Sequence, residues 1–232
     1  MNKFIFIGAA DKTDLLLHCA ELLSLLADVN VLLVDATVNG NYQSVFGFEK
    51  DNIFDYYNKF DITTVNALDG LAFDLYDVCL IDTDMLANLC TVLRSFNEPD
   101  EQTKIFCVTS FKKDELLPLK EQLKNMAALG YNNINNYYCV FYDVPFTGIK
   151  TDYVLSTLFE TKGVSTYELN PTDNDRDLNI SEQHNERMNF KKHSKAYRAS
   201  ILNICVNICN LNISWFNKYV KKNVRTLKGP RL

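Results

Sequence analysis

Hydrophobic positions along the first 170 residues alternate between short, fully apolar runs and longer segments with a helical period. The run Val29–Val34 is β-branched or aliphatic at nearly every position, as in parallel strands that are covered by helices on both faces. The segment that precedes it, up to Ala27, is leucine-rich on nearly all sides and long enough for a helix. This alternation predicts an α/β fold, a single domain with a doubly wound, mostly parallel sheet flanked by helices.

The elements expected from this pattern follow one another in a regular order. Strands are predicted over residues 3–7, 29–34, 77–82, 104–109, 137–142 and 164–169. Helices are predicted over residues 11–27, 84–96, 112–129 and 147–162, with a short one ending near Gly47 and glycine stops at Gly130 and Gly163. Residues 50–70 are predicted as a short helix and a connection, residues 170–186 as a solvated loop, and the chain from Asn189 as helical again.

The turn between the first strand and the first helix is the candidate binding site. In open α/β sheets, ligands bind beyond the carboxyl ends of the strands, which places a site near Gly8, Asp35 and Asp82. Asp11 suits the N-cap of the helix, and Asp14 three residues later approximates a capping box.

Composition narrows the class of protein further. A chain of 232 residues that is 47% hydrophobic can bury one sizeable core, and no window supplies about 20 uncharged apolar residues for a membrane span. Seven cysteines lie in apolar runs without a C-x-x-C pair, which predicts buried thiols and a cytoplasmic location. The three histidines form no H-E-x-x-H or similar set, so no zinc chemistry is expected. Asp173, Asp175 and Asp177 resemble the start of a calcium loop, but Leu178 and His184 replace the required Gly and Glu.

Charge divides the chain into two segments, residues 1–186 and 187–232. The second carries eleven Lys or Arg and no acidic residue, whereas the first carries all 29 acidic side chains against 13 basic ones. We therefore predict an α/β core over 1–186 and a basic helical segment over 187–232, packed on the core or extending from it. Its cationic end consists of Lys218, Lys221, Lys222, Arg225 and Lys228. This end is either a solvated helix tip, a contact for an anionic membrane surface or nucleic acid, or a self-association helix.

Taken together, these segments resemble the ParA/MinD family of deviant P-loop ATPases over most of the chain. Lys12-Thr13 resembles the end of that family's phosphate loop, and Val31–Ala36 with Gly40-Asn41 resembles its second strand and first switch. Tyr76–Thr83 is similar to its Walker B strand and second switch, and Ser194–Arg198 to the start of its final helix. The resemblance implies a P-loop NTPase-like fold with a C-terminal helix.

The departures from the family pattern fall on its catalytic parts. The family loop K-G-G-x-G-K-[ST] is shortened here to one glycine, Gly8, and its first lysine has no counterpart. Backbone N–H groups need glycine to approach a phosphate closely, and Asp11 adds a carboxylate that faces the ligand's charge. At an effective dielectric of about 20, two unit charges 4 Å apart repel by roughly 4 kcal/mol. This repulsion exceeds the stabilisation that a helix N-terminus gives to a bound anion. The family's D-x-D switch reads Asp35-Ala36-Thr37, and Asp143 stands where an adenine-reading Asn is expected.

The function expected from this comparison is that of a degenerate ParA/MinD-like protein, a pseudo-ATPase that serves as an interaction scaffold. The resemblance implies a role in partition, division-site or pilus positioning, or secretion or conjugation assembly, with protein partners and a homodimer. Its vestigial nucleotide site comprises Gly8, Asp11, Lys12, Thr13, Asp35 and Asp82. No catalytic residue is assigned and no cofactor is expected.

Two alternatives remain open at this point. The first is an active hydrolase that binds ATP through Lys12 and magnesium through Thr13 and Asp82. The second is a module that binds nucleic acid or a membrane surface through the basic C-terminal helix, with a peripheral membrane location in the latter case.

Overall fold

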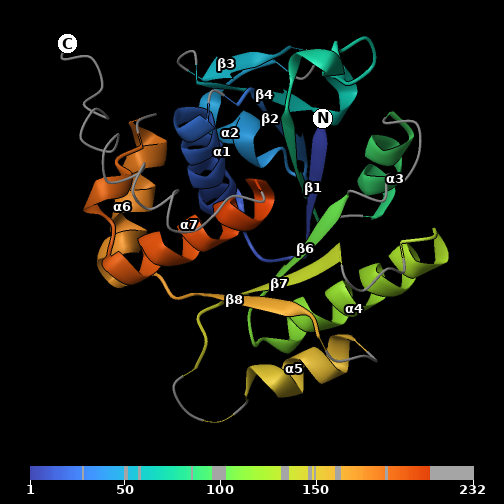
Figure 1. Ribbon diagram of the computed structural model, residues 1–232, viewed down its shortest axis with the longest axis vertical. Coiled ribbons are helices and arrows are strands. Elements are labelled where there is room, and N and C mark those ends of the chain that lie inside the picture. Colours follow the sequence, from blue (N-terminus) through green and yellow to red (C-terminus); the bar gives the residue numbers. More distant parts are fainter. Residues whose placement is uncertain are drawn as a thin grey trace.

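The fold is built around one eight-stranded sheet (Figure 1) in the order β3-β4-β2-β5-β1-β6-β7-β8, parallel except for β3. The computed structural model describes residues 1–27, 29–49, 52–56, 59–84, 86–95, 103–131, 136–145, 148, 150–159, 163–185 and 188–209. The strands are β1 (Asn2–Ile7), β2 (Val31–Ala36), β3 (Phe54–Tyr56), β4 (Phe60–Thr64), β5 (Val78–Thr83), β6 (Lys104–Thr109), β7 (Tyr137–Tyr142) and β8 (Ser165–Leu169). The predicted mostly parallel α/β sheet is confirmed.

Helices cover both faces of this sheet, with α1, α6 and α7 on one side and α3, α4 and α5 on the other (Figure 1). The helices are α1 (Thr13–Ala27), α2 (Asn41–Phe46), α3 (Leu86–Ser95), α4 (Lys113–Ala128), α5 (Thr151–Leu158), α6 (Asp173–His184) and α7 (Lys195–Cys209). Short 3₁₀ turns lie at Val65–Ala67, Phe73–Leu75 and Phe190–Lys192.

The central strand β1 shows how the sequence produces two cores. Successive side chains of a strand point to opposite faces. Phe4 and Phe6 therefore lie in the core that contains α1 and α7, whereas Ile5 and Ile7 lie in the core that contains α3, α4 and α5. Because both faces are buried from Phe4 to Ile7, this part of the strand is apolar, as predicted for a covered parallel sheet.

Residues 50–70 were predicted as a short helix and a connection, and this prediction is wrong. Within the described part of this range, β3 pairs antiparallel with β4, with Phe54 opposite Ile62 and Tyr56 opposite Phe60. The Tyr56 and Phe60 rings stack at 4.7 Å, and both residues are buried. Alternating aromatic and polar residues thus give a half-buried strand pair at the sheet edge.

The solvated loop predicted over residues 170–186 is also wrong, because this segment contains α6. Thr172 caps the helix: its hydroxyl accepts from Asp175 N at 3.2 Å, and Asp175 Oδ2 accepts from Thr172 N at 2.9 Å. This reciprocal capping box starts a helix whose buried side chains are polar, namely Asp175, Asn179 and Glu182. Their spacing of four and three residues places them on one helix face.

The remaining boundaries differ little from expectation. The helix predicted over 147–162 is shorter, because Lys150 and Phe159 on either side of α5 have extended backbones. Helix α7 packs against α1, and Tyr197, Ile201 and Ile204 lie in the core. The basic residues predicted at 218–228 lie outside the described residues. Within the described part of the chain, no helix is both long and apolar enough to span a bilayer.

Candidate functional site

The carboxyl ends of β1, β2 and β5 meet at the centre of the sheet. Asp35 of β2 lies opposite Asp82 of β5, and Asp82 lies opposite Phe6 of β1. Gly8 and Lys12 follow β1 directly in the turn that leads into α1. The structure therefore brings together all the strand ends that the sequence analysis assigned to a binding site.

Gly8 is the residue that allows the turn after β1 to close against β6. Its φ of +129° lies in the region that L side chains rarely adopt. A Cβ atom at this position would lie 2.0 Å from the carbonyl oxygen of Val108. Glycine is thus required for the close backbone approach, whether or not a phosphate binds.

The Lys12 side chain turns back into this loop and is almost fully buried, with 2% exposure. Its Nζ donates to the carbonyl oxygens of Gly8 at 2.7 Å and Ala10 at 3.1 Å, and it lies 3.1 Å from Asp82 Oδ1. An ammonium group has three donors, and three acceptors surround this one. The cation that would meet a phosphate is therefore neutralised and hydrogen-bonded by the protein itself.

Asp82 has a partner beside each of its carboxylate oxygens, although Oδ1 only forms the ion pair with Lys12 and accepts no hydrogen bond among the described residues. Oδ1 faces Lys12, and Oδ2 accepts the hydroxyl proton of the buried Tyr42 at 2.9 Å. Burial raises the pKa of Asp82 to about 6, although Lys12 and Tyr42 lower it. Burial and the neighbouring Asp82 carboxylate also raise the pKa of Tyr42 well above its usual value. Tyr42, which the sequence analysis did not single out, is therefore a neutral donor that links α2 to the end of β5.

Asp35 organises the segment between β2 and α2. Its Oδ1 accepts from the Thr37 backbone N–H at 3.1 Å and hydroxyl at 2.6 Å, while its Oδ2 accepts from Tyr42 N at 2.9 Å. The carboxylate thereby satisfies N–H groups at the start of α2, where a negative charge is favourable. These bonds give Asp35 and Thr37 a structural role in the segment between β2 and α2.

Asp11 was predicted as the N-cap of α1, and the structure places the cap one residue later. The first helical hydrogen bond runs from Leu16 N to the carbonyl oxygen of Lys12 at 2.9 Å, so Lys12 is the N-cap. Asp11 Oδ1 accepts from Thr13 N at 2.9 Å and from the Thr13 hydroxyl at 2.7 Å. Asp14 accepts from Gln183 Nε2 of α6 at 2.7 Å, in place of the expected capping-box contact. Thr13 consequently directs its hydroxyl proton at a carboxylate.

A surface cavity of about 280 Å³ lies beside this centre, on the side of β2 and β4. Its lining includes Asp35, Thr37, Gly40, Thr64 and Asn88. Lys12, Thr13 and Asp82 do not line it. Lys12 and Asp82 therefore face each other, Thr13 faces Asp11, and the open space lies next to the segment between β2 and α2.

The order of the strands and the central strand–loop–helix unit define an α/β protein with a P-loop NTPase-like fold. More narrowly, the fold is that of the ParA/MinD P-loop ATPases. Neither the protein-family models nor the curated protein sequences give a match to this chain.

Three solved structures illustrate the similarity. A chain of the MinC:MinD cell division protein complex of Aquifex aeolicus superposes with a TM-score of 0.67 at 11% identity, covering 91% of this chain and 97% of that one. A protein of Borrelia burgdorferi B31 described as a plasmid partition protein, bound to AMPPNP, gives 0.60 at 17% identity, covering 90% and 99%. The ATP complex of a Cyanothece McdA variant gives 0.59 at 11% identity, covering 91% and 97%. At sequence identities this low, the similarity shows a shared fold.

Proposed function

We propose that this protein is a degenerate ParA/MinD-like scaffold, a pseudo-ATPase that binds protein partners and does not depend on ATP hydrolysis. The observation that carries the proposal is the internal engagement of the Lys12 ammonium, by hydrogen bonds to Gly8 O and Ala10 O and by an ion pair with Asp82. A phosphate could reach Lys12 only after these contacts break. Separating a buried ion pair costs about 3–5 kcal/mol, which the ligand would have to supply.

Two further positions support the loss of turnover. Where the resembling family has a second Asp that assists hydrolysis, this chain has Thr37, whose hydroxyl proton is donated to Asp35. At the position of the adenine-reading Asn stands Asp143, which pairs with Arg176 of α6. The groups that would position water and base are thus replaced by side chains engaged in internal contacts.

The proposed scaffold role is supported by the fold and by the assemblies named for two structural neighbours. One structural neighbour is a chain of a MinC:MinD cell division protein complex, and another is described as a plasmid partition protein. We propose that this chain likewise organises a partition, division-site, pilus or secretion assembly through protein contacts, as a homodimer. Since the dimer would not need a bridging nucleotide, its mass in light scattering should be the same with and without ATP and magnesium.

A second candidate function is ATP binding and hydrolysis by the same site. It is favoured by the contact between Lys12 and Asp82 at the strand ends, and by the AMPPNP and ATP bound to two structural neighbours. In this case the ligand would displace the Gly8 and Ala10 carbonyls from Lys12, and magnesium would take Thr13 and Asp82.

Phosphate release from ATP distinguishes the two functions. The scaffold proposal predicts equal, background release by the wild type and the Lys12→Ala variant in the presence of magnesium. Lys120→Ala, which removes an exposed lysine of α4, is the matched control. Release by the wild type and Lys120→Ala well above that of Lys12→Ala would overturn the proposal in favour of the hydrolase.

The basic residues Lys218, Lys221, Lys222, Arg225 and Lys228 provide a further candidate contact. We propose that they attach the scaffold to an anionic surface, either membrane or nucleic acid. Co-sedimentation with anionic vesicles and salt-dependent DNA binding separate the two targets. Truncation after Phe216 should abolish whichever contact is observed.

A further inference from the structure

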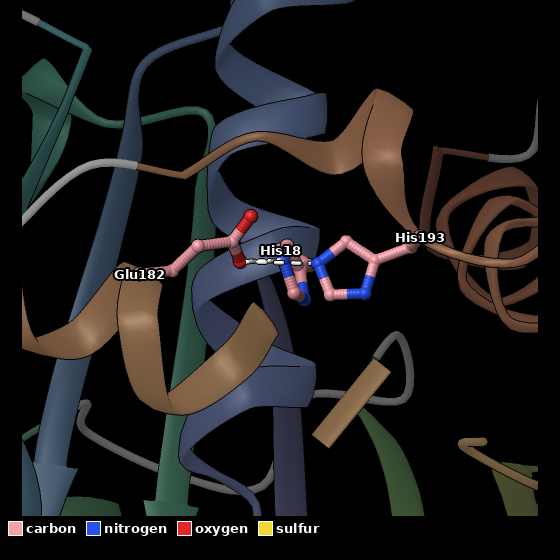
Figure 2. Close-up of side chains that lie close together, drawn as sticks. All are labelled: His18, Glu182 and His193. Carbon is pink, nitrogen blue, oxygen red and sulfur yellow. Dashed lines mark hydrogen bonds and ion pairs between the residues drawn. The ribbon is translucent and has the colours of Figure 1, made fainter. Parts of the chain in front are cut away.

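Three buried polar side chains from three separate segments converge between α1, α6 and the start of α7 (Figure 2). They are His18 of α1, Glu182 of α6 and His193, which precedes α7. His18 Nε2 lies 2.9 Å and His193 Nε2 lies 3.1 Å from the same oxygen, Glu182 Oε2. All three residues are buried. One carboxylate oxygen and two ring nitrogens therefore point at one place inside the protein.

The outward-facing ring nitrogens lie near other polar side chains. His18 Nδ1 lies 3.1 Å from the hydroxyl of Tyr197, and His193 Nδ1 lies 3.4 Å from Asp175 Oδ1. A histidine that ligates a metal through one nitrogen usually donates its other N–H to a carboxylate, carbonyl or hydroxyl, which fixes the tautomer. Asp175 is itself held by the Thr172 cap and by Ser194 N at 2.6 Å. His18 thus has the outer hydrogen bond that orients a metal-ligating ring, whereas His193 Nδ1 lies near the Asp175 carboxylate without a hydrogen bond to it.

Counting protons shows that the cluster needs a cation. If both rings carry their proton on Nδ1, two nitrogen lone pairs and a carboxylate oxygen face one another with nothing between them. If both carry it on Nε2, the lone pair of His193 Nδ1 faces the Asp175 carboxylate. Neutral rings leave an acceptor against an acceptor in either case, and burial makes such a contact costly. The positive charge must come either from an extra proton on His193 or from a metal ion.

The geometry points to a metal ion. We propose that His18, Glu182 and His193 form a binding site for a divalent transition metal, of which zinc fits the ligand set best. The three ligand atoms lie within 4.8 Å of one another. Zinc bonds of about 2.0–2.1 Å separate tetrahedral ligands by roughly 3.3 Å, so the two contacts with Glu182 need to lengthen by only a few tenths of an ångström.

The surroundings of the cluster fit this assignment. Glu182 Oε1 accepts from Asn189 N at 2.5 Å, which leaves Oε2 for the centre. A cavity of about 10 Å³ beside His18 and Glu182 has room for about one water molecule as a fourth ligand. The site is independent of the proposed scaffold function, since it shares no residue with the Lys12–Asp82 pair. A metal ion bound there would hold α6 and the segment before α7 against α1.

Metal titration of the full chain, stripped with a chelator, tests the site directly. The protein is titrated with Zn²⁺ by calorimetry and with Co²⁺ by visible absorption, with bound metal counted by mass spectrometry. The third histidine of the chain, His184, is exposed on α6, which makes His184→Gln a matched control. His193→Gln and Glu182→Gln remove single ligands, and circular dichroism verifies that they fold.

The wild type and His184→Gln should bind one metal ion per chain, with a tetrahedral Co²⁺ spectrum and a raised melting temperature. Because loss of an outer-shell partner alone weakens metal sites by about 10–100-fold, loss of a ligand should weaken binding by about 100-fold or more. A wild type that binds neither metal overturns the proposal, and the three side chains are then joined by hydrogen bonds that include an extra proton. So does His193→Gln binding as tightly as the wild type, or a thiolate-to-cobalt charge-transfer band, which would place the metal on cysteine.

Discussion

The ammonium group of Lys12 lies 3.1 Å from Asp82 Oδ1, in an interior where the two residues are 2% and 0% exposed. This ion pair joins the turn after β1 to the end of β5, the two segments that the resembling family uses for phosphate and magnesium. Its charges are satisfied within the chain, by Gly8 O and Ala10 O on one side and Tyr42 on the other. The pair therefore acts here as a structural element of the sheet centre.

A double-mutant cycle should reveal strong coupling between these two residues. Lys12→Met alone leaves Asp82 buried without its counter-charge and should lower the free energy of unfolding by about 3 kcal/mol. Asp82→Asn should cost less, because burial already disfavours the ionised form of this carboxyl. The double variant should lie within about 1–2 kcal/mol of the wild type, because it removes both charges. Urea unfolding measures all four proteins. Simple addition of the two single effects would show that the pair is not coupled.

Titration of the Asp82 carboxyl should also make the free energy of unfolding depend on pH. Burial raises the folded-state pKa of Asp82 from 3.8 to about 6. The folded protein therefore binds this proton more tightly than the unfolded chain. The contribution of Asp82 is fully present below about pH 4 and is lost as the pH rises to about 6, by roughly 3 kcal/mol in total.

The difference in unfolding free energy between the wild type and Asp82→Asn isolates this contribution. Measured between pH 4 and 7.5, the wild type should lose stability relative to the variant as the pH rises. Parallel curves for the two proteins would mean that the Asp82 carboxyl titrates at the same pH in the folded and unfolded states.

Gly8→Ala tests the close backbone approach of the turn to β6. The new Cβ would lie 2.0 Å from Val108 O at a φ of +129°, so we expect a loss of about 3 kcal/mol or more. Gly70→Ala is the matched control, since Gly70 has a φ of +94° but no atom within 4 Å of a Cβ. Its cost should be about 1 kcal/mol, from backbone strain alone. Equal costs at the two sites in thermal or urea unfolding would argue against the steric account.

Thr172→Ala tests the capping box that starts α6. The substitution removes the hydroxyl that accepts from Asp175 N and should cost about 1 kcal/mol, within a usual range of about 0.5–2. Thr157→Ala on the exposed side of α5 is the comparison variant, with an expected change within about 0.5 kcal/mol. A Thr172→Ala variant as stable as Thr157→Ala in urea would show that the cap contributes nothing.

Apolar runs made the central sheet predictable. A segment such as Val31–Ala36 is buried at every position, and only a covered parallel strand needs that composition. The edge strand pair was not predicted, because the composition around Phe54, Tyr56 and Phe60 is mixed. The alternation of these aromatic residues with polar ones was the signal for a strand. Helix α6 was missed for a different reason: its buried face is polar, so it has no apolar stripe. The spacing of Asp175, Asn179 and Glu182 after Thr172 was the available signal.

The candidate site was predictable in location but not in its contacts. Strand ends determine that Gly8, Asp35 and Asp82 meet. The sequence does not determine where a long, flexible lysine side chain places its ammonium group, nor that Tyr42 reaches Asp82. The histidine cluster was hidden because His18 and Glu182 are 164 residues apart, and sequence motifs report only ligands that lie close together along the chain.

Calorimetric titration of the wild type with ATP and magnesium, beside Lys12→Ala, tests the central claim most directly. Since the protein's own carbonyls and Asp82 occupy the donors of Lys12, the wild type should show no saturable binding, and Lys12→Ala should give the same flat titration. Saturable binding by the wild type that disappears in a folded Lys12→Ala variant would contradict the account, because it would mean that Lys12 leaves its internal partners for a phosphate.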